Sequence, residues 1–249
     1  MNFEIGSHII YREACDSTNR LLKEILDKEA INEGTVLWSG YQTEGKGYHS
    51  NQWESKPNQN LLLSMVLHPV WLDPGQQFLI SKAISIGILE YLGNYSSEFM
   101  IKWPNDIWFR EKKIAGILIE NTIQGNALSS TIVGIGLNIN QITFDSDASN
   151  PISLSNICGK SFDLTPELKN LCSCLNASYQ LLKDGLVQEI HSIYFEKLMG
   201  TEDFQSYKTE SDSFRAKVIG IGTYGSLLLQ KENSDVLEFG FKEVELLST

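Results

Sequence analysis

Apolar residues recur at two different spacings along this chain, and the spacing separates helices from strands. Between residues 21 and 26 they fall on one face of a helix, directly after three side chains that could cap it, Ser17, Thr18 and Asn19. The pattern predicts a helix over residues 19–28. Similar spacing predicts further helices over residues 76–91, 166–183 and 186–198.

Continuous apolar and β-branched runs predict strands over residues 35–42 and 61–67, with a polar stretch, residues 43–60, between them. That stretch is too long for a hairpin turn, and its glycines and Trp53 favour a binding loop. Further strands are expected over residues 100–103, 107–109, 113–120 and 131–138, the last two joined by a turn at residues 124–126. The order of elements predicts an α+β fold with a mainly antiparallel sheet flanked by helices.

The pattern changes after the last predicted helix. Short apolar runs separated by glycine-containing turns predict strands over residues 214–219, 226–230, 236–239 and 244–247. We therefore expect residues 201–249 to form a small β-barrel-like domain. Because so short a segment can bury little core by itself, it should dock on a larger domain, residues 1–200.

Composition and charge narrow the class of protein. The 249 residues are 42% hydrophobic, with 19 Gly against 6 Pro, which is typical of a compact globular protein. Apolar runs stay below the roughly 18 residues of a membrane span, and residues 1–11 lack the features of a signal peptide. We expect a cytoplasmic protein without a membrane partner, whose four cysteines are reduced thiols. The formal net charge of −11 disfavours nucleic-acid binding.

Two short runs carry the densest chemistry: Lys102-Trp103-Pro104-Asn105-Asp106 and Lys113-Ile114-Ala115-Gly116. Pro104 disfavours helix in the residue before it, so the first run can leave a strand and place Asn105 and Asp106 at its end. Lys113 opens a strand whose small middle residues let a planar ligand lie against the backbone. Each run also has a purely structural interpretation, as a capped turn, a Lys102 to Asp106 ion pair, or close packing against a helix.

Small residues return at Gly134 and Gly136, on the neighbouring predicted strand. Two such windows side by side indicate a ligand more strongly than either alone. In the long loop, the Gly-Lys-Gly run of residues 45–47 offers backbone N–H groups to an anion, although it lacks the ending of a Walker phosphate loop. The alternative there is a flexible linker, and Trp53 either covers a ligand or anchors the loop.

In their order along the chain, these motifs resemble those of biotin protein ligases, also called biotin acetyl-CoA carboxylase ligases. The resemblance covers most of the chain and rests on Asp16-Ser17-Thr18-Asn19, on Gln42-Thr43-Glu44-Gly45-Lys46-Gly47 leading to Trp53, on the two lysine-containing runs, and on Gly134 to Asn138. It implies a class II synthetase-like catalytic domain and a small C-terminal SH3-like β-barrel.

The reaction implied by this resemblance has two steps. Biotin and ATP, with Mg²⁺, give biotinyl-5'-AMP and pyrophosphate; a lysine of a biotin carboxyl carrier domain, from acetyl-CoA carboxylase or a related carboxylase, then takes the biotinyl group. Biotin is a substrate and ATP a co-substrate, so no tightly bound prosthetic group is expected. Both steps can be accelerated by alignment and charge stabilisation, without an enzyme nucleophile.

The resemblance also assigns ligand contacts. Those expected for biotin are Ser17, Thr18, Asn19, Gln42, Lys46, Gly47, Tyr48, Trp53, Lys113, Gly116, Gly134 and Gly136, the three last glycines giving room for the biotin ring. Those expected for the nucleotide are Lys46, Asn105, Lys113 and Asn138. As catalytic residues, Lys113 would stabilise charge on the reacting phosphate, and Asp106 would orient the acceptor amine and accept its proton.

The chain departs from the family in its loop, where Gly45-Lys46-Gly47-Tyr48 stands in place of the usual Gly-Arg-Gly-Arg. Lysine and tyrosine cannot bind a phosphate in the bidentate way of arginine, so either they suffice or biotinyl-AMP leaks faster. Some members also have an N-terminal helix-turn-helix domain and act as repressors. Because the first motif begins at Asp16, we expect a ligase that does not bind DNA.

Two other functions stay open at this point. One is a lipoate ligase or octanoyltransferase, whose catalytic domain shares the general fold; the other is a catalytically weak, biotin-binding regulatory protein, suggested by the altered loop. Trp53 and the run from Trp103 to Asp106 favour the biotin enzyme. The sequence does not tell whether the chain is a monomer or homodimer, which carrier it modifies, or which groups hold Mg²⁺.

Overall fold

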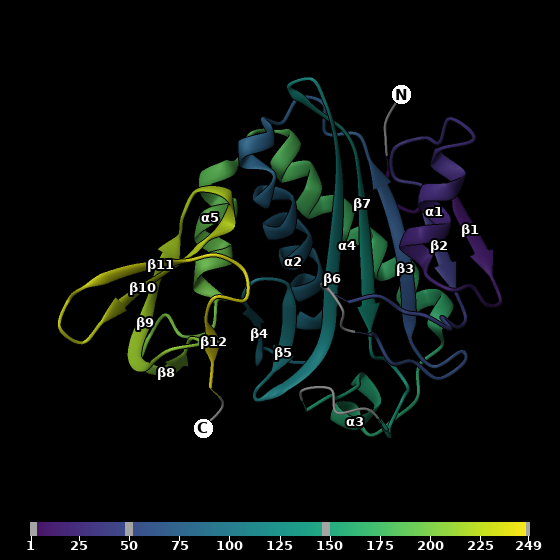
Figure 1. Cartoon of the computed structure of the whole chain (residues 1–249). Coiled ribbons are helices and arrows are strands. Elements are labelled where there is room, and N and C mark those ends of the chain that lie inside the picture. The colour runs from purple at the N-terminus through teal and green to yellow at the C-terminus, as the bar shows by residue number, and fades with distance from the viewer. Residues whose placement is uncertain (1–3, 48–51, 146–149, 248–249) are drawn as a thin grey trace.

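The larger of two sheets dominates the fold of the protein, for which a computed structural model describes residues 4–47, 52–145 and 150–247 (Figure 1). Its seven strands lie in the order β1-β2-β3-β7-β6-β5-β4. They are β1 Ile9–Arg12, β2 Val36–Ser39, β3 Leu61–Leu67, β4 Phe99–Lys102, β5 Asp106–Phe109, β6 Lys112–Gln124 and β7 Ala127–Leu137. Only β1 and β2 pair in parallel, so the predicted mainly antiparallel sheet is confirmed.

The central strand β3 is buried on both faces, which explains its unbroken apolar sequence. Alternate residues along a strand point to opposite faces. Leu63 and Met65 belong to the main core, whereas Val66 packs in a smaller cluster with Leu22, which lies on helix α1 (Thr18–Leu26). Ser64 is the one polar residue of this strand, and it faces the α1 side.

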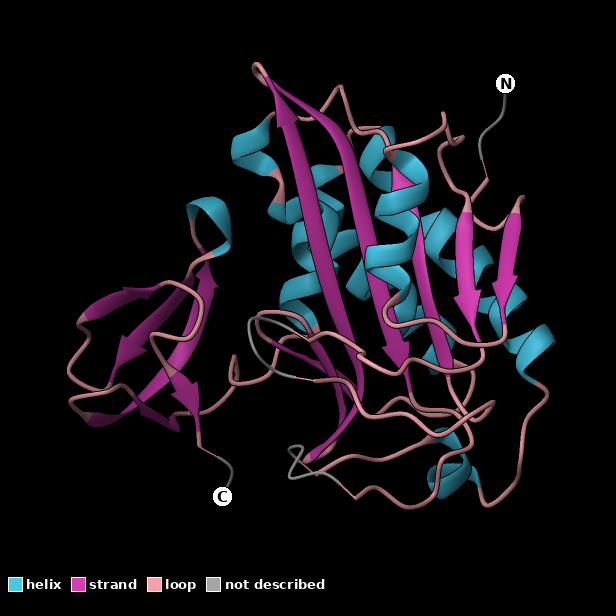
Figure 2. Ribbon diagram, turned by 45° about the vertical axis from the view of Figure 1, so that its right-hand side comes forward, coloured by secondary structure: helices cyan, strands magenta, loops and turns pink. Residues whose placement is uncertain are grey.

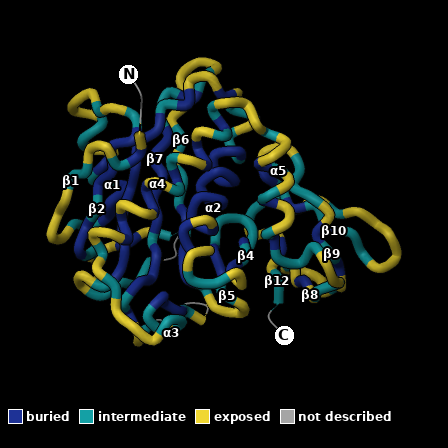
Figure 3. The backbone as a smooth tube through the Cα atoms, turned by 180° about the vertical axis from the view of Figure 1, so that it is seen from behind, coloured by how far each residue is buried: buried dark blue, intermediate teal, exposed yellow. Residues whose placement is uncertain are grey.

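Helices cover both faces of the large sheet (Figure 2). On one face α2 Phe78–Gly93 packs against α4 Leu164–Lys183 and α5 Val187–Glu196; on the other, α1 Thr18–Leu26 lies over β3 and β7. The short helix α3 Leu154–Cys158 follows β7. In Figure 3 the backbone of α2 is almost entirely buried, as expected for a helix that is apolar on nearly every side.

The second sheet has five strands in the order β11-β10-β9-β8-β12. They are β8 Gln205–Lys208, β9 Ser213–Ile221, β10 Leu227–Lys231, β11 Val236–Phe239 and β12 Glu245–Leu246. Its buried residues, Val218 and Leu229 among them, are continuous with the main core. Trp103 fastens this sheet to the larger one: its indole N–H donates to the carbonyl of Gly225 at 2.8 Å, and its ring lies 5.3 Å from that of Phe241. The small sheet therefore docks on the large one, as its size predicted.

The elements predicted from spacing are present with shifted ends, but two strands, one α-helix and two 3-10 helices, Pro74–Gln76 and Thr223–Gly225, were missed among the described residues. β1, β8 and α3 are too short to give a clear periodic signal. Ser17 occupies the N-cap position of α1, but its side chain makes no capping hydrogen bond. The prediction that this side chain caps the helix was therefore wrong. No helix within the described residues is long and apolar enough to cross a membrane.

Candidate active site

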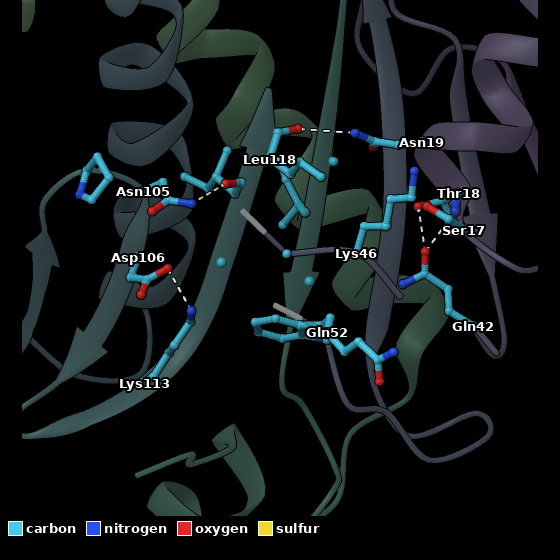
Figure 4. A pocket seen from close by; sticks show the side chains of 18 of the residues that line it. Ser17, Thr18, Asn19, Gln42, Lys46, Gln52, Asn105, Asp106, Lys113 and Leu118 are labelled. Atoms are coloured by element: carbon cyan, nitrogen blue, oxygen red, sulfur yellow. Dashed lines mark hydrogen bonds and ion pairs between the residues drawn. The ribbon is translucent and has the colours of Figure 1, made fainter. Parts of the chain in front are cut away.

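A cavity of about 190 Å³ opens where α1, β6 and β7 meet the long loop (Figure 4). It gathers side chains from segments far apart in the sequence. Its lining residues are Ser17, Thr18, Asn19, Gln42, Lys46, Gly47, Gln52, Trp53, Pro104, Asn105, Asp106, Lys113, Gly116, Ile117, Leu118, Gly134, Ile135, Gly136, Phe241 and Lys242. The structure thus brings nearly all predicted site residues to one place.

The glycines on β6 and β7 make room for protein side chains. Gly116 and Gly136 are register partners, and a Cβ atom on them would lie 2.9 Å and 2.4 Å from the indole ring of Trp53. A Cβ on Gly134 would lie 2.3 Å from Oδ1 of Asn19. In this structure the three glycines seat Trp53 and Asn19, whose side chains wall the cavity, and their contact with the biotin ring stays a prediction.

Polar groups at the start of α1 form a connected network. Thr18 donates to Oε1 of Gln42 from its backbone N–H at 2.7 Å, and its hydroxyl oxygen lies 3.1 Å from the same atom. Ser64 lies behind them, 2.7 Å from the Thr18 hydroxyl and 2.6 Å from Oδ1 of Asn19. The Asn19 amide nitrogen donates to Glu120 at 2.7 Å. Because Gln42 Oε1 already accepts from the backbone N–H of Thr18, its amide nitrogen is the group left for a ligand.

The two predicted catalytic residues form an ion pair, with the Lys113 ammonium 2.7 Å from Oδ1 of Asp106 (Figure 4). Their side chains are 26% and 22% exposed, so the pair lies at the cavity wall and not in the core. The Lys113 ammonium also lies 5.6 Å from the Trp53 ring centroid. A cation and a carboxylate are thus held side by side next to the covered glycine strands.

The alternative ion pair between Lys102 and Asp106 is not what the structure shows. The Lys102 ammonium lies over the ring of Trp108, 4.1 Å from its centroid. Burial lowers the pKa of Lys102, and the nearby carboxylates only partly offset this effect. Lys102 lies outside the cavity lining. Although Lys102 is the register partner of Asp106, only Lys113 of the two lysines forms an ion pair with that carboxylate among the described residues.

The long loop folds back over the cavity. Lys46 and Gln52 form an isolated antiparallel β-bridge between the two arms of the loop. The backbone N–H of Trp53 donates to the carbonyl of Gly45 at 2.8 Å. The Arg20 guanidinium, which contacts Asp16, also donates to Glu44 at 3.2 Å and ties the base of the loop to α1. The tip, with the predicted contact Tyr48, lies outside the described residues.

The two asparagines assigned to the nucleotide lie in different surroundings. Asn105 lines the cavity, and its amide nitrogen donates to the carbonyl of Ile117 at 2.7 Å. Asn138 is 2% exposed, outside the described cavity lining, and donates to the carbonyl of Ile152 at 3.1 Å. Its Oδ1 has no hydrogen-bond partner among the described residues. Its nucleotide contact stays a prediction.

Several lining residues had no signal in the sequence. Ile117, Leu118 and Ile135 read as ordinary strand residues, and Phe241 and Lys242 come from the small C-terminal sheet. Gln52 could have been inferred from its place beside Trp53. Within residues 4–47, 52–145 and 150–247, no group of three or more His, Cys, Asp or Glu side chains is placed to hold a metal ion.

Comparisons with known proteins show which family the chain belongs to. Residues 11–138 match the Biotin/lipoate A/B protein ligase family. Bifunctional ligase/repressor BirA of Bacillus subtilis is 29% identical over 97% of this chain and 75% of that protein. That of Bacillus spizizenii is 30% identical over 92% of this chain and 71% of that protein. Biotin--[acetyl-CoA-carboxylase] ligase of Mycobacterium tuberculosis is 30% identical over 55% of this chain and 52% of that protein.

The fold is also similar to that of solved structures. The structure of biotin protein ligase from Aquifex aeolicus in complex with biotin and ATP superposes with a TM-score of 0.80, at 24% identity, over 98% of this chain and 100% of that chain. The chain is a member of the Biotin/lipoate A/B protein ligase family.

Proposed function

We propose that this protein is an ATP-dependent biotin protein ligase. One observation carries the proposal: a single cavity joins the polar start of α1, the Lys46 loop, the Lys113 to Asp106 ion pair and the Trp53-covered glycines of β6 and β7. Those are the parts that an enzyme would need to bind a small polar ring at one end and an activated carboxylate at the other. The family relationship supports the same function.

In the first step, a biotin carboxylate oxygen attacks the α-phosphorus of ATP, and the bond to the pyrophosphate oxygen breaks. Thr18 and the amide nitrogen of Gln42 would hold the ureido ring, because they are polar groups fixed at the cavity wall. Lys113 would lie between the carboxylate and the α-phosphate. A fixed cation at that position stabilises the negative charge that develops as the two anions react.

In the second step, a neutral lysine amine attacks the biotinyl carbonyl, an amide bond forms, and AMP leaves. Asp106 would accept the proton that the amine loses. In the free protein Asp106 is engaged by Lys113 at 2.7 Å. An adenylate phosphate that draws Lys113 toward itself would leave the Asp106 carboxylate available to the incoming amine.

Mg²⁺ would accompany ATP, and we propose that phosphate oxygens supply most of its ligands, as is common for nucleotide-bound magnesium. The acceptor would be the lysine-bearing domain of a biotin-dependent carboxylase. A lipoate substrate is less favoured, since the Mycobacterium tuberculosis relative is a biotin--[acetyl-CoA-carboxylase] ligase and since Trp53 narrows the cavity beside β6 and β7.

One assay tests the proposal. The protein is incubated with MgATP, either biotin or lipoate, and a biotin carboxyl carrier domain; pyrophosphate release and the mass of the carrier are measured. Biotin-dependent pyrophosphate release and a mass increase of one biotinyl group are expected. Activity with lipoate alone would contradict the proposal, and biotin binding without pyrophosphate would point to a regulatory protein.

A further inference from the structure

Ser64 is a buried serine that none of the sequence motifs singled out. It lies in β3 among leucines, methionine and valine and is 0% exposed. It is absent from the described residues that line the cavity, so it does not reach a ligand there. A hydroxyl in such surroundings costs free energy unless it is hydrogen-bonded, so its partners give the reason for its presence.

Both partners of Ser64 belong to the start of α1. Its oxygen lies 2.7 Å from the Thr18 hydroxyl and 2.6 Å from Oδ1 of Asn19. Because Asn19 Oδ1 can only accept, the single Ser64 proton goes to Asn19, and Ser64 accepts from the Thr18 hydroxyl. Thr18 in turn holds Gln42 Oε1 through its backbone N–H at 2.7 Å. Ser64 is thus two hydrogen bonds away from the Gln42 side chain, which lines the cavity.

The Asn19 side chain is held from its opposite end as well. Its amide nitrogen donates to Glu120 at 2.7 Å and to the carbonyl of Leu118 at 3.3 Å, both on β6. Its oxygen, bonded to Ser64, occupies the space that the missing side chain of Gly134 leaves. These contacts fix the amide in one orientation, with the oxygen toward β3 and the nitrogen toward β6.

We propose that Ser64 is a positioning residue for ligand recognition: it holds Thr18 and Asn19, and through Thr18 it orients Gln42. The inference rests on the proposed function, since the recognised ligand is the ureido ring of biotin. Ser64 does not touch the ligand or the reacting atoms, which lie beside Lys113. Loss of its hydroxyl should therefore weaken biotin binding and leave ATP binding and the chemical step nearly unchanged.

Ser64→Ala removes the hydroxyl and keeps the rest of the side chain. Its biotin Kd, measured by titration calorimetry, is expected to rise about tenfold, which is the effect of one neutral hydrogen bond. The Kd for ATP and the kcat of adenylation at saturating biotin should stay within about twofold of the parent values. Ser64→Cys keeps a side chain of similar size with a weaker donor, so its biotin Kd should lie between those of the parent and Ser64→Ala. It also serves as the test if the alanine variant folds poorly.

Ser85→Ala is the matched control. Ser85 is also 0% exposed, but it lies in α2 and its hydroxyl has no hydrogen-bond partner among the described residues. Its removal should leave the biotin Kd unchanged. A second control is the double variant of Ser64→Ala and Thr18→Val. If Ser64 acts partly through Thr18, the double variant should lose less free energy of biotin binding than the two single variants lose in sum.

The outcomes are separable. A parent protein that binds no biotin overturns the proposed function itself. A parent that binds biotin, with Ser64→Ala and Ser64→Cys equal to it, overturns only the positioning role. The positioning role is also overturned if Ser85→Ala weakens biotin binding as much, if kcat falls with the affinity, or if the losses of Ser64→Ala and Thr18→Val simply add.

Discussion

The Lys113 ammonium lies 2.7 Å from the Asp106 carboxylate, so the two lysine- and aspartate-containing runs of the sequence meet as one ion pair. The two side chains come from adjacent strands, with Asp106 opposite Gly116, Lys113 opposite Trp108, and a register shift between these pairs. Each charge offsets the other before a ligand binds. An arriving phosphate would therefore compete with Asp106 for Lys113.

Separate roles for the two charges predict separate defects. Lys113→Ala should lower the rate of pyrophosphate release by about 100-fold or more, since it removes the cation at the reacting phosphate. Asp106→Asn should lower transfer to the carrier by a similar factor, at the scale of a lost general base, with adenylation affected much less. Rapid-quench assays of each half-reaction measure both. Lys112→Ala, at an exposed neighbour, is the control; near-normal rates in both test variants would contradict the assignment.

Seating of Trp53 against the glycines predicts a defect when a methyl group is added there. In Gly136→Ala the new Cβ would meet the indole ring at 2.4 Å, so Trp53 must move out of its seat. We expect weaker binding of biotin by about tenfold and a higher protease sensitivity of the loop. Gly93→Ala is the control, since a Cβ there meets nothing within 4 Å. A Gly136→Ala protein with parental biotin Kd would show that Trp53 does not wall the ligand site.

Tyr48, which stands in place of the usual second loop arginine, predicts faster dissociation of biotinyl-AMP. Tyr48→Arg adds a guanidinium able to bind the adenylate phosphate in a bidentate way. Release of biotinyl-AMP into solution, measured in the absence of a carrier, should slow several-fold relative to the parent. Val236→Arg, at a residue 55% exposed on the small sheet, controls for the added charge. Equal release from the parent and Tyr48→Arg would count against this account of the loop.

A buried lysine outside the site predicts a pH effect on stability. Burial lowers the pKa of Lys82 to about 8, and its ammonium lies 2.8 Å from Nδ1 of His191 and faces the rings of Phe78 and Tyr194. Burial, and then the charge of Lys82, lowers the pKa of His191 as well. Between pH 8 and the ordinary lysine pKa, the unfolded chain binds more protons at this residue than the folded one. This residue therefore adds stability as pH rises, by at most about 1.4 kcal/mol per pH unit.

Lys82→Met tests that effect, because methionine fills similar space without a charge. Urea unfolding at a series of pH values from 7.5 to 9.5 gives the free energy of unfolding of both proteins. The stability advantage of the variant should shrink as pH rises. A constant difference between parent and variant over this range would show that Lys82 keeps its proton in the folded state. Lys28→Met, at an exposed lysine, should give no such trend.

Periodicity predicted most of the large elements because it depends on one segment at a time. β3 and α2 carry long apolar runs, and both were placed within a few residues. β1 and β8, four residues each, give too few positions for a period to be recognised. β1 is stabilised by pairing with β2, beyond helix α1, and β8 by pairing with both β9 and the C-terminal strand β12. Ser17 shows the same limit. Its sequence context favours a capping hydrogen bond, but its side chain makes none in the structure.

The sequence by itself determined the family motifs, the α+β layout and the identity of most residues around the cavity. These are properties of residue type and local spacing, which the chain carries in linear form. Tertiary structure decided which groups meet: Lys113 with Asp106, Trp53 with Gly136, and Ser64 with Thr18 and Asn19. Those contacts arise from strand register and from helix packing across the sheet, and neither is encoded in the spacing of any single motif.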